Sequence, residues 1–297
     1  MRHLTHAEIP TWCVIAAVYG GWLALTFHYH QLPAWLVLPL GAWLLAWHGS
    51  LQHEALHGHP TRRPRVNALI AGPPLALWLP FPLYRESHMA HHRAQLTDPY
   101  DDPESFYTAP DQWARLAPPV RWLRRALHTV SGRLALGPLA VVWRLWSAEA
   151  GRVAAGERRR VAIWAVHAGS VALILFWVVA VCGIPLWAYL ALFVYPGLSL
   201  TLLRSFTEHR PAAEPAQRTA VVEAGRLLSL LYLNNNLHVL HHQSPQLPWY
   251  ELPRHYRARR GALLEENGHF AFAGYADVLR RYALRSKDSP VHPGAGA

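Results

Sequence analysis

The stretch IPTWCVIAAVYGGWLALTFHYHQLPAWLVLPLGAWLLAWHGSLQ, residues 9–52, decides the fold of this chain. Its 44 residues contain no Asp, Glu, Lys or Arg. One helical membrane span needs about 20 apolar residues, so this length suits two spans and a turn. The segment HYHQLP, residues 28–33, is typical of a turn and lies near the middle. The stretch therefore predicts a helical hairpin in a membrane.

A second uncharged run, residues 161–203, repeats this pattern over 43 residues, with the turn signal CGIP at residues 182–185. Two hairpins are thus predicted, with spans at about residues 10–28, 33–52, 161–181 and 185–203. A third uncharged run, residues 66–84, contains four prolines, which remove helix donors that lipid cannot replace. This run is expected to be re-entrant or interfacial.

The charged residues are few and unevenly placed. They make up 15% of the chain, against about 25% in soluble domains, and the two predicted turns carry no Lys or Arg. The positive-inside rule then places the turns outside the cytoplasm and predicts a cytosolic cap from residues 53–160 and 204–285. Residues 286–297 are predicted to be a disordered tail. The net charge of +10 favours anionic lipid headgroups, and no nucleic-acid-binding motif accompanies it.

Three histidine clusters accompany the apolar runs: HEALH at residues 53–57, HMAHH at 88–92 and HVLHH at 238–242. Spacings of three and four residues place each cluster on one face of a helix. The first cluster follows the second predicted span, the second lies between the hairpins and the third follows the fourth span, so all three are expected on the same side of the membrane. Histidine is the commonest metal ligand, and eight imidazoles exceed what one ion holds. The clusters therefore predict a site for two metal ions, whereas a lone histidine among the 20 is expected to be structural.

Two other interpretations of the clusters stay open on the residues alone. HEALH also fits the H-E-x-x-H pattern of zinc proteases, although that function leaves both H-x-x-H-H clusters without a role. A non-catalytic metal carrier or sensor is the other. Imidazole suits zinc, copper, iron and nickel, so ligand type does not select the element. The two cysteines, Cys13 and Cys182, are too few for a four-cysteine iron–sulfur cluster.

The order of the clusters around two hairpins resembles the integral-membrane fatty acid desaturase family, with its related hydroxylases and ketolases, over about residues 10–260. The segments RSFTEHR (204–210), NNNLHVLHH (234–242) and PWYELP (248–253) are similar to bacterial acyl desaturases in particular. The resemblance implies an all-α integral membrane protein, with four transmembrane helices in two hairpins and a cytosolic helical cap carrying a histidine-rich dimetal site. It also implies a place in a bacterial inner membrane, with the active site on the cytosolic side.

The resemblance further implies a ligand set for two Fe ions. The implied ligands are His53, His57, His88, His91, His92, His238, His241 and His242, with His209 as a ninth. Asn234, four residues before His238, is a candidate for holding a metal-bound water, with helix capping as the alternative. Metal-bound imidazoles usually donate their other N–H to a carboxylate. The carboxylate candidates are Glu54, Asp98, Asp101, Asp102, Glu104 and Glu208.

In the family these irons activate O2, and the function expected here is desaturation of a long acyl chain. Hydroxylation or ketone formation on a lipid or other hydrocarbon is the alternative on the same site, and the sequence does not separate the outcomes. The chain shows no flavin or haem motif, so the two electrons must come from outside. The resemblance suggests ferredoxin or a similar donor with its reductase, drawn to the basic cytosolic face.

Overall fold

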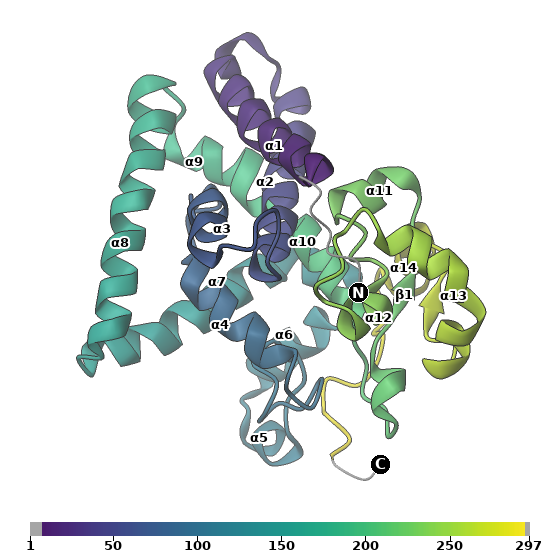
Figure 1. Cartoon of the computed structure of the whole chain (residues 1–297). Coiled ribbons are helices and arrows are strands. Elements are labelled where there is room, and N and C mark those ends of the chain that lie inside the picture. Colours follow the sequence, from purple (N-terminus) through teal and green to yellow (C-terminus); the bar gives the residue numbers. More distant parts are fainter. Residues whose placement is uncertain (1–7, 295–297) are drawn as a thin grey trace. The chain divides into compact units, whose positions relative to one another are not determined.

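The computed structural model describes residues 8–294, and nearly all of their regular structure is helical (Figure 1). The chain divides into two compact units. Unit 1 comprises the residues up to Pro82 together with Arg144–Leu198, and unit 2 comprises Leu83–Trp143 together with the residues from Ser199 onward.

Four helical segments of the described residues are long and apolar enough to cross a membrane. They comprise α1 (Ile9–Phe27); α2 (Ala34–Leu56); α8 (Arg158–Leu175) with the π-helix η2 (Phe176–Val181); and α9 (Leu186–Tyr189) with the π-helix η3 (Leu190–Val194) and α10 (Tyr195–Glu208). Four apolar helical segments of sufficient length thus lie where the four spans were predicted, and their crossing of a membrane stays a prediction. Three of the segments run further than the predicted spans, since α2 includes His53, α8 begins at Arg158 and α10 reaches Glu208. The arrangement in two hairpins and the cytosolic cap stay predictions.

In unit 1, α1 packs along α2, and the 3-10 turn η1 (Tyr29–Gln31) connects them (Figure 1). Trp22 of α1 donates its indole N–H to the hydroxyl of Tyr189 over 3.0 Å, and this hydroxyl donates to the carbonyl of Leu75 over 2.7 Å. Gly41 lets α2 approach η3 closely, because a Cβ there would lie 2.8 Å from the carbonyl oxygen of Leu192. The contact at Gly41 packs η3 against α2, the helix that carries His53.

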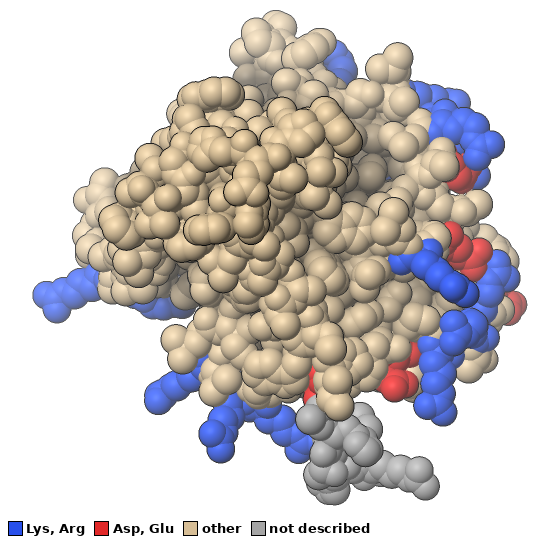
Figure 2. Space-filling model, turned by 90° about the horizontal axis from the view of Figure 1, so that it is seen from above, with Lys and Arg blue, Asp and Glu red and all other residues tan. Residues whose placement is uncertain are grey.

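The span formed by α8 and η2 is largely uncovered by protein. Only 11% of its most apolar 18-residue stretch is buried, and the side chains of Leu173 and Phe176 are 72% and 64% exposed. Figure 2 shows a broad surface area without Lys, Arg, Asp or Glu, with basic side chains gathered outside it. Such apolar exposure is expected where lipid covers a helix.

The uncharged run at residues 66–84 is not a span. Helix α3 (Pro64–Ala71) ends before Pro73 and Pro74, residues 72–80 are irregular, and α4 begins at Phe81 with Pro82 in its first turn. The prolines thus interrupt the helix as expected. The membrane depth of this segment stays a prediction.

Unit 2 contains most of the remaining elements. They are α5 (Pro110–Arg115), α6 (Pro118–Leu127), η4 (Pro215–Arg218), β1 (Val221–Val222), α11 (Arg226–Leu231), α12 (His238–Gln243), α13 (Leu252–Glu266), β2 (Ala271–Phe272) and α14 (Tyr275–Tyr282). Three helices include residues of both units: α4 (Phe81–His91), α7 (Val130–Ala154) and α10. The strands pair in parallel, with Val221 opposite Ala271. Beside them, Val239 and Leu240 of α12 share an apolar core with Leu252 and Leu263 of α13, which holds the short α12 in place.

Residues 286–294 were predicted to belong to a disordered tail, but they lie against the segment before α5. The backbone N–H of Thr108 donates to Pro290 O, and that of His292 donates to Thr108 O, each over 2.9 Å. The predicted tail also includes residues 295–297, which lie outside the described residues.

Candidate metal centre

Helices position the histidines of all three clusters. His88 and His91 lie in the last turn of α4, and His92 continues it through a backbone hydrogen bond to His88. Helix α12 begins at His238 and carries His241 and His242. In unit 1, α2 carries His53 and ends at His57. The prediction that local spacing gathers each cluster on one helical face is thus confirmed.

Four imidazoles of unit 2 form one compact group, the four-histidine group: His91, His209, His238 and His242. One ligand atom of each lies within 4.8 Å of those of the others. The Nε2 atom of His209 lies 3.1 Å from that of His91 and 3.1 Å from that of His238. His242 Nε2 is 3.2 Å from His238 Nε2. His209, from the end of α10, therefore joins residues of two separate clusters.

A second group in unit 2, the three-histidine group, consists of His88, His92 and His241. Their Nε2 atoms lie 3.1 Å apart from His88 to His92 and 3.1 Å from His92 to His241. Consecutive residues belong to different groups: His91 and His92 divide between them, and so do His241 and His242. Each of the two helices therefore contributes to both groups.

These spacings fit a shared metal ion. With metal–nitrogen bonds of about 2.1 Å, neighbouring ligand atoms lie about 3.0 Å apart in an octahedral shell and about 3.4 Å apart in a tetrahedral one. The observed separations of 3.1–3.2 Å lie in this range. The ring nitrogens of each group thus converge as ligands of one ion do.

His53 and His57 belong to unit 1 and lie side by side there. Their ring centroids are 4.9 Å apart, and His53 is buried. Glu54, the candidate carboxylate between them in sequence, is also buried.

Two of the predicted carboxylates, Asp102 and Glu208, meet histidines of the four-histidine group. Asp102 Oδ1 lies 2.8 Å from His91 Nδ1, and both side chains are buried. Glu208 Oε1 lies 3.5 Å from His238 Nδ1 and 2.7 Å from the guanidinium of Arg204. The hydrogen bond between Asp102 and His91 Nδ1 fixes which nitrogen of that ring carries the proton and leaves Nε2 for a metal.

Glu104, which sequence reasoning had also considered, lies 3.3 Å from His88 Nδ1. Asn235, which sequence reasoning missed, lies with its side-chain oxygen 3.0 Å from His238 Nδ1. The only signal for Asn235 was its place three residues before His238.

Asp98 and Asp101 shape the loop instead. Asp98 accepts the backbone N–H of Tyr100 over 2.8 Å, and Asp101 accepts that of Gln95 over 2.6 Å. For these two the ordinary role of an acidic turn is observed, and among residues 8–294 neither contacts a histidine of the two groups.

Asn234 does not share a helical face with His238. Residues 232–236 form a turn in which Asn234 has φ 57°, and its amide N–H donates to Trp249 O over 2.9 Å. Helix α12 does not extend back to Asn234, because the chain takes up a left-handed turn there that asparagine tolerates. A role for Asn234 in holding a metal-bound water stays a prediction.

Burial and crowding govern the charges of the histidines. Burial lowers the pKa values of His209, His238 and His242 well below the usual range, and neighbouring imidazoles add to this effect. Burial also acts on His91, but the carboxylates of Glu104 and Asp102 outweigh it and raise the pKa to about 9. Most of the four-histidine group is thus neutral at pH 7, as metal binding requires.

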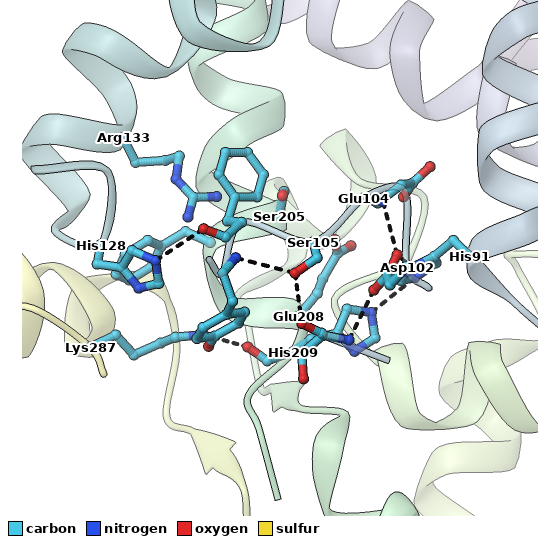
Figure 3. A pocket seen from close by; sticks show the side chains of 14 residues that line it. His91, Asp102, Glu104, Ser105, His128, Arg133, Ser205, Glu208, His209 and Lys287 are labelled. Atoms are coloured by element: carbon cyan, nitrogen blue, oxygen red, sulfur yellow. Dashed lines mark hydrogen bonds and ion pairs between the residues drawn. The ribbon is translucent and has the colours of Figure 1, made fainter. Parts of the chain in front are cut away.

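A cavity of about 40 Å³ adjoins this group, large enough for water. Figure 3 shows His91, Asp102 and Glu208 at one part of its wall and His128, Arg133 and Lys287 at another. The cavity thus lies within unit 2 and has a polar lining.

Comparison with known proteins adds a family and two relatives. Residues 30–273 match the family described as "Fatty acid desaturase". A protein of Paracoccus sp. (strain PC1) named beta-carotene ketolase is 28% identical over 262 residues, which cover 84% of this chain and 90% of that protein. A beta-carotene ketolase of Paracoccus sp. (strain N81106 / MBIC 01143) is 26% identical over 260 residues, which cover 81% and 89%.

Proposed function

The chain belongs to the fatty acid desaturase family, and from this premise we propose that it is a diiron, O2-dependent oxidase acting on a C–H bond of a long lipid hydrocarbon. The family and the relatives identify an oxidoreductase that associates with membranes and acts on lipid. The zinc-protease interpretation of HEALH has no support in these comparisons. The observation that carries the proposal is the pair of histidine groups in unit 2, whose Nε2 atoms converge as ligands do.

Nine histidines would hold the two irons. The four-histidine group supplies one set, with His209 as the residue outside the three clusters. The three-histidine group supplies part of the other, and we propose that His53 and His57 complete it, because their cluster has the same helical spacing and lies at the end of a predicted span. Bound irons would supply the activation of O2 needed to break an unactivated C–H bond.

The surrounding residues orient these ligands. Asp102 holds His91, while Glu208, itself paired with Arg204, lies behind His238. Burial excludes bulk water from the four-histidine group, since His91 and His238 are each 2% exposed. Rigid ligands in a water-poor site suit oxidation chemistry, in which side reactions must be avoided.

The first substrate class to test is a carotenoid. Both relatives named beta-carotene ketolase align over more than four fifths of this chain and nearly nine tenths of their own length. Conversion of a ring CH2 to a ketone takes two successive oxygenations, each consuming one O2, two electrons and two protons and releasing water. A separate electron donor, a ferredoxin or similar protein with its reductase, would supply these electrons.

Desaturation of an acyl chain is the second candidate. The segments RSFTEHR and PWYELP favour it, because they resemble acyl desaturases. Here two hydrogens leave neighbouring carbons, and O2 with two electrons and two protons becomes two waters. The distribution of arginine favours an active site on the cytosolic side for either reaction. The resemblance to bacterial acyl desaturases favours the bacterial inner membrane.

Lipid analysis of a bacterial host tests the proposal. The chain is expressed with a ferredoxin and its reductase, once in cells that make β-carotene and once in cells that do not, and lipids are compared by mass spectrometry. A keto-carotenoid supports the first candidate, and a new acyl double bond supports the second. Purified protein should contain two irons. Zinc with peptide hydrolysis, or iron-loaded protein that oxidises neither lipid, would overturn the proposal.

A further inference from the structure

The chain has a single lysine, Lys287, and it is buried beside the four-histidine group. The other 27 of its 28 basic residues are arginines. The side chain of Lys287 is 8% exposed, and its ammonium donates to the backbone carbonyl of His209 over 2.5 Å. Burying an ammonium is costly unless it is hydrogen-bonded or paired. A retained lysine at this position therefore calls for a specific role.

Lys287 belongs to a segment that lies along the site, residues 286–292, here called the strap. Its backbone is tied at two places. Lys287 N–H donates to His128 O over 2.9 Å, and Thr108 is bonded on both sides, to Pro290 and to His292. The strap thus lies against Thr108, which follows the turn at residues 97–105 that contains Asp102.

Asp288 fastens the strap through its side chain. Its carboxylate accepts the Tyr107 hydroxyl over 2.5 Å and lies 2.9 Å from His128 Nδ1. Lys287 Nζ is 3.7 Å from the same carboxylate. Tyr107 and His128 are both buried, so these bonds are shielded from water and stronger than surface contacts.

Two short connections run from the strap to metal-ligand candidates. One is direct, from Lys287 to the carbonyl of His209. The other passes through Thr97: its hydroxyl lies 3.1 Å from His292 Nε2, and its backbone N–H donates to Asp102 over 3.0 Å. Asp102 in turn contacts His91. The strap therefore reaches two of the four histidines by separate paths.

We propose that the strap holds His209 and the Asp102 loop in register, with Lys287 as a positioning residue of the metal centre. The ammonium fits this task because it is a compact point charge, whereas a guanidinium is a wider planar fork. The part of the proposal that concerns metal retention rests on the proposed diiron function. The part that concerns the strap does not.

A single lysine makes the strap directly measurable. The full chain in detergent, without added metal, is treated with an amine-reactive reagent, and modification of Lys287 is followed by peptide mass spectrometry, which separates it from the N-terminal amine. Slow labelling is expected in the parent. In Asp288→Asn, labelling is expected to be about fivefold faster or more, because the strap loses a charged anchor. Arg285→Met removes an exposed charge two residues before Lys287 and should leave the labelling rate unchanged.

Metal retention is the second readout. Iron-loaded Lys287→Met, Arg285→Met and parent protein are mixed with a ferrous chelator, and iron release is followed by absorbance. Lys287→Met should release about half of its iron about tenfold faster or more, while Arg285→Met follows the parent. If Lys287→Met does not fold, as judged by gel filtration and helicity, the same release measurement on Asp288→Asn decides.

The two readouts separate the ideas. Fast labelling of Lys287 in the parent, or no change in Asp288→Asn, overturns the strap. Parent-like iron release from the folded variant overturns the positioning role. A parent that binds no iron instead overturns the proposed function, while the labelling result still stands.

Discussion

The Nδ1 atom of His91 lies 2.8 Å from Oδ1 of Asp102, and this contact turns the other ring nitrogen, Nε2, toward His209. Asp102 also accepts backbone N–H groups from Thr97 and Glu104, so one carboxylate orders both the loop and the ligand. A carboxylate behind a ligating imidazole fixes its tautomer and direction.

Asp102→Asn should lower lipid-oxidation activity or iron affinity about 10- to 100-fold, because the amide cannot replace the charged acceptor on all its partners. Product formation per iron and iron titration measure this. Asp101→Asn is the matched control, since Asp101 accepts only a backbone N–H of the same loop, and it should change either quantity less than about threefold. Equal losses in both variants would mean that the loop as a whole, and not the contact with His91, matters.

His209→Ala should lower bound iron from two per chain to about one. His209 Nε2 lies 3.1 Å from Nε2 of both His91 and His238, so its removal takes one nitrogen from the four-histidine group. The three-histidine group keeps all its imidazoles. Elemental analysis of the purified protein gives the count. His255→Ala, an exposed position on α13, should keep both irons. Two irons in His209→Ala would exclude His209 from the ligands.

Gly41→Ala should destabilise unit 1 by about 1–3 kcal/mol. Its new Cβ would lie 2.8 Å from Leu192 O and 2.9 Å from Phe193 Cδ1, which forces α2 and η3 apart. Gly20→Ala is the control in α1, where a Cβ meets nothing within 4 Å. The thermal midpoint in detergent should fall for the first variant only. Equal thermal midpoints for Gly41→Ala and Gly20→Ala would show that α2 and η3 can move apart at little cost in stability.

Stability should depend on pH through Asp288. Burial raises the pKa of this carboxyl, but Lys287 and the hydrogen bonds from His128 and Tyr107 outweigh burial and bring it below the usual value. A folded pKa below the unfolded one stabilises the protein above the unfolded pKa of about 3.9, and this stabilisation is lost as pH falls through the folded value.

Metal-free parent protein should therefore lose thermal stability more steeply than Asp288→Asn as the pH falls from about 5 to about 3. Above this window the parent should be the more stable of the two. Thermal unfolding of both proteins at each pH provides the comparison, and parallel curves would contradict the assignment.

The spans and the clusters could be predicted because both are local. Residues 9–52 contain enough apolar length for two helices whatever surrounds them, and histidines three or four residues apart share a helical face in any fold. The helices then extended past the predicted ends, because HEALH continues the helical pattern of α2.

Which polar side chains contact the histidines of the two groups could not be predicted, because this depends on the course of the backbone and not on residue spacing in the sequence. Asp98, Asp101 and Asp102 looked equivalent in sequence, yet the turn from residue 97 to 105 directs only Asp102 to a histidine. Likewise, the left-handed turn at Asn234 leads the chain into α12 and brings Asn235 to His238. Polar composition suggested disorder beyond residue 285, whereas residues 286–294 pair with a distant segment, which composition cannot report.

The division of neighbouring histidines between the two groups has a consequence for how the centre assembles. Each ion that binds would fix both α4 and α12, since each helix gives ligands to both groups. Binding of the first ion would then carry most of the conformational entropy lost when the two helices become ordered, and the second ion would bind helices already in place. Metal uptake should be cooperative, with a sigmoidal isotherm and few chains holding a single ion.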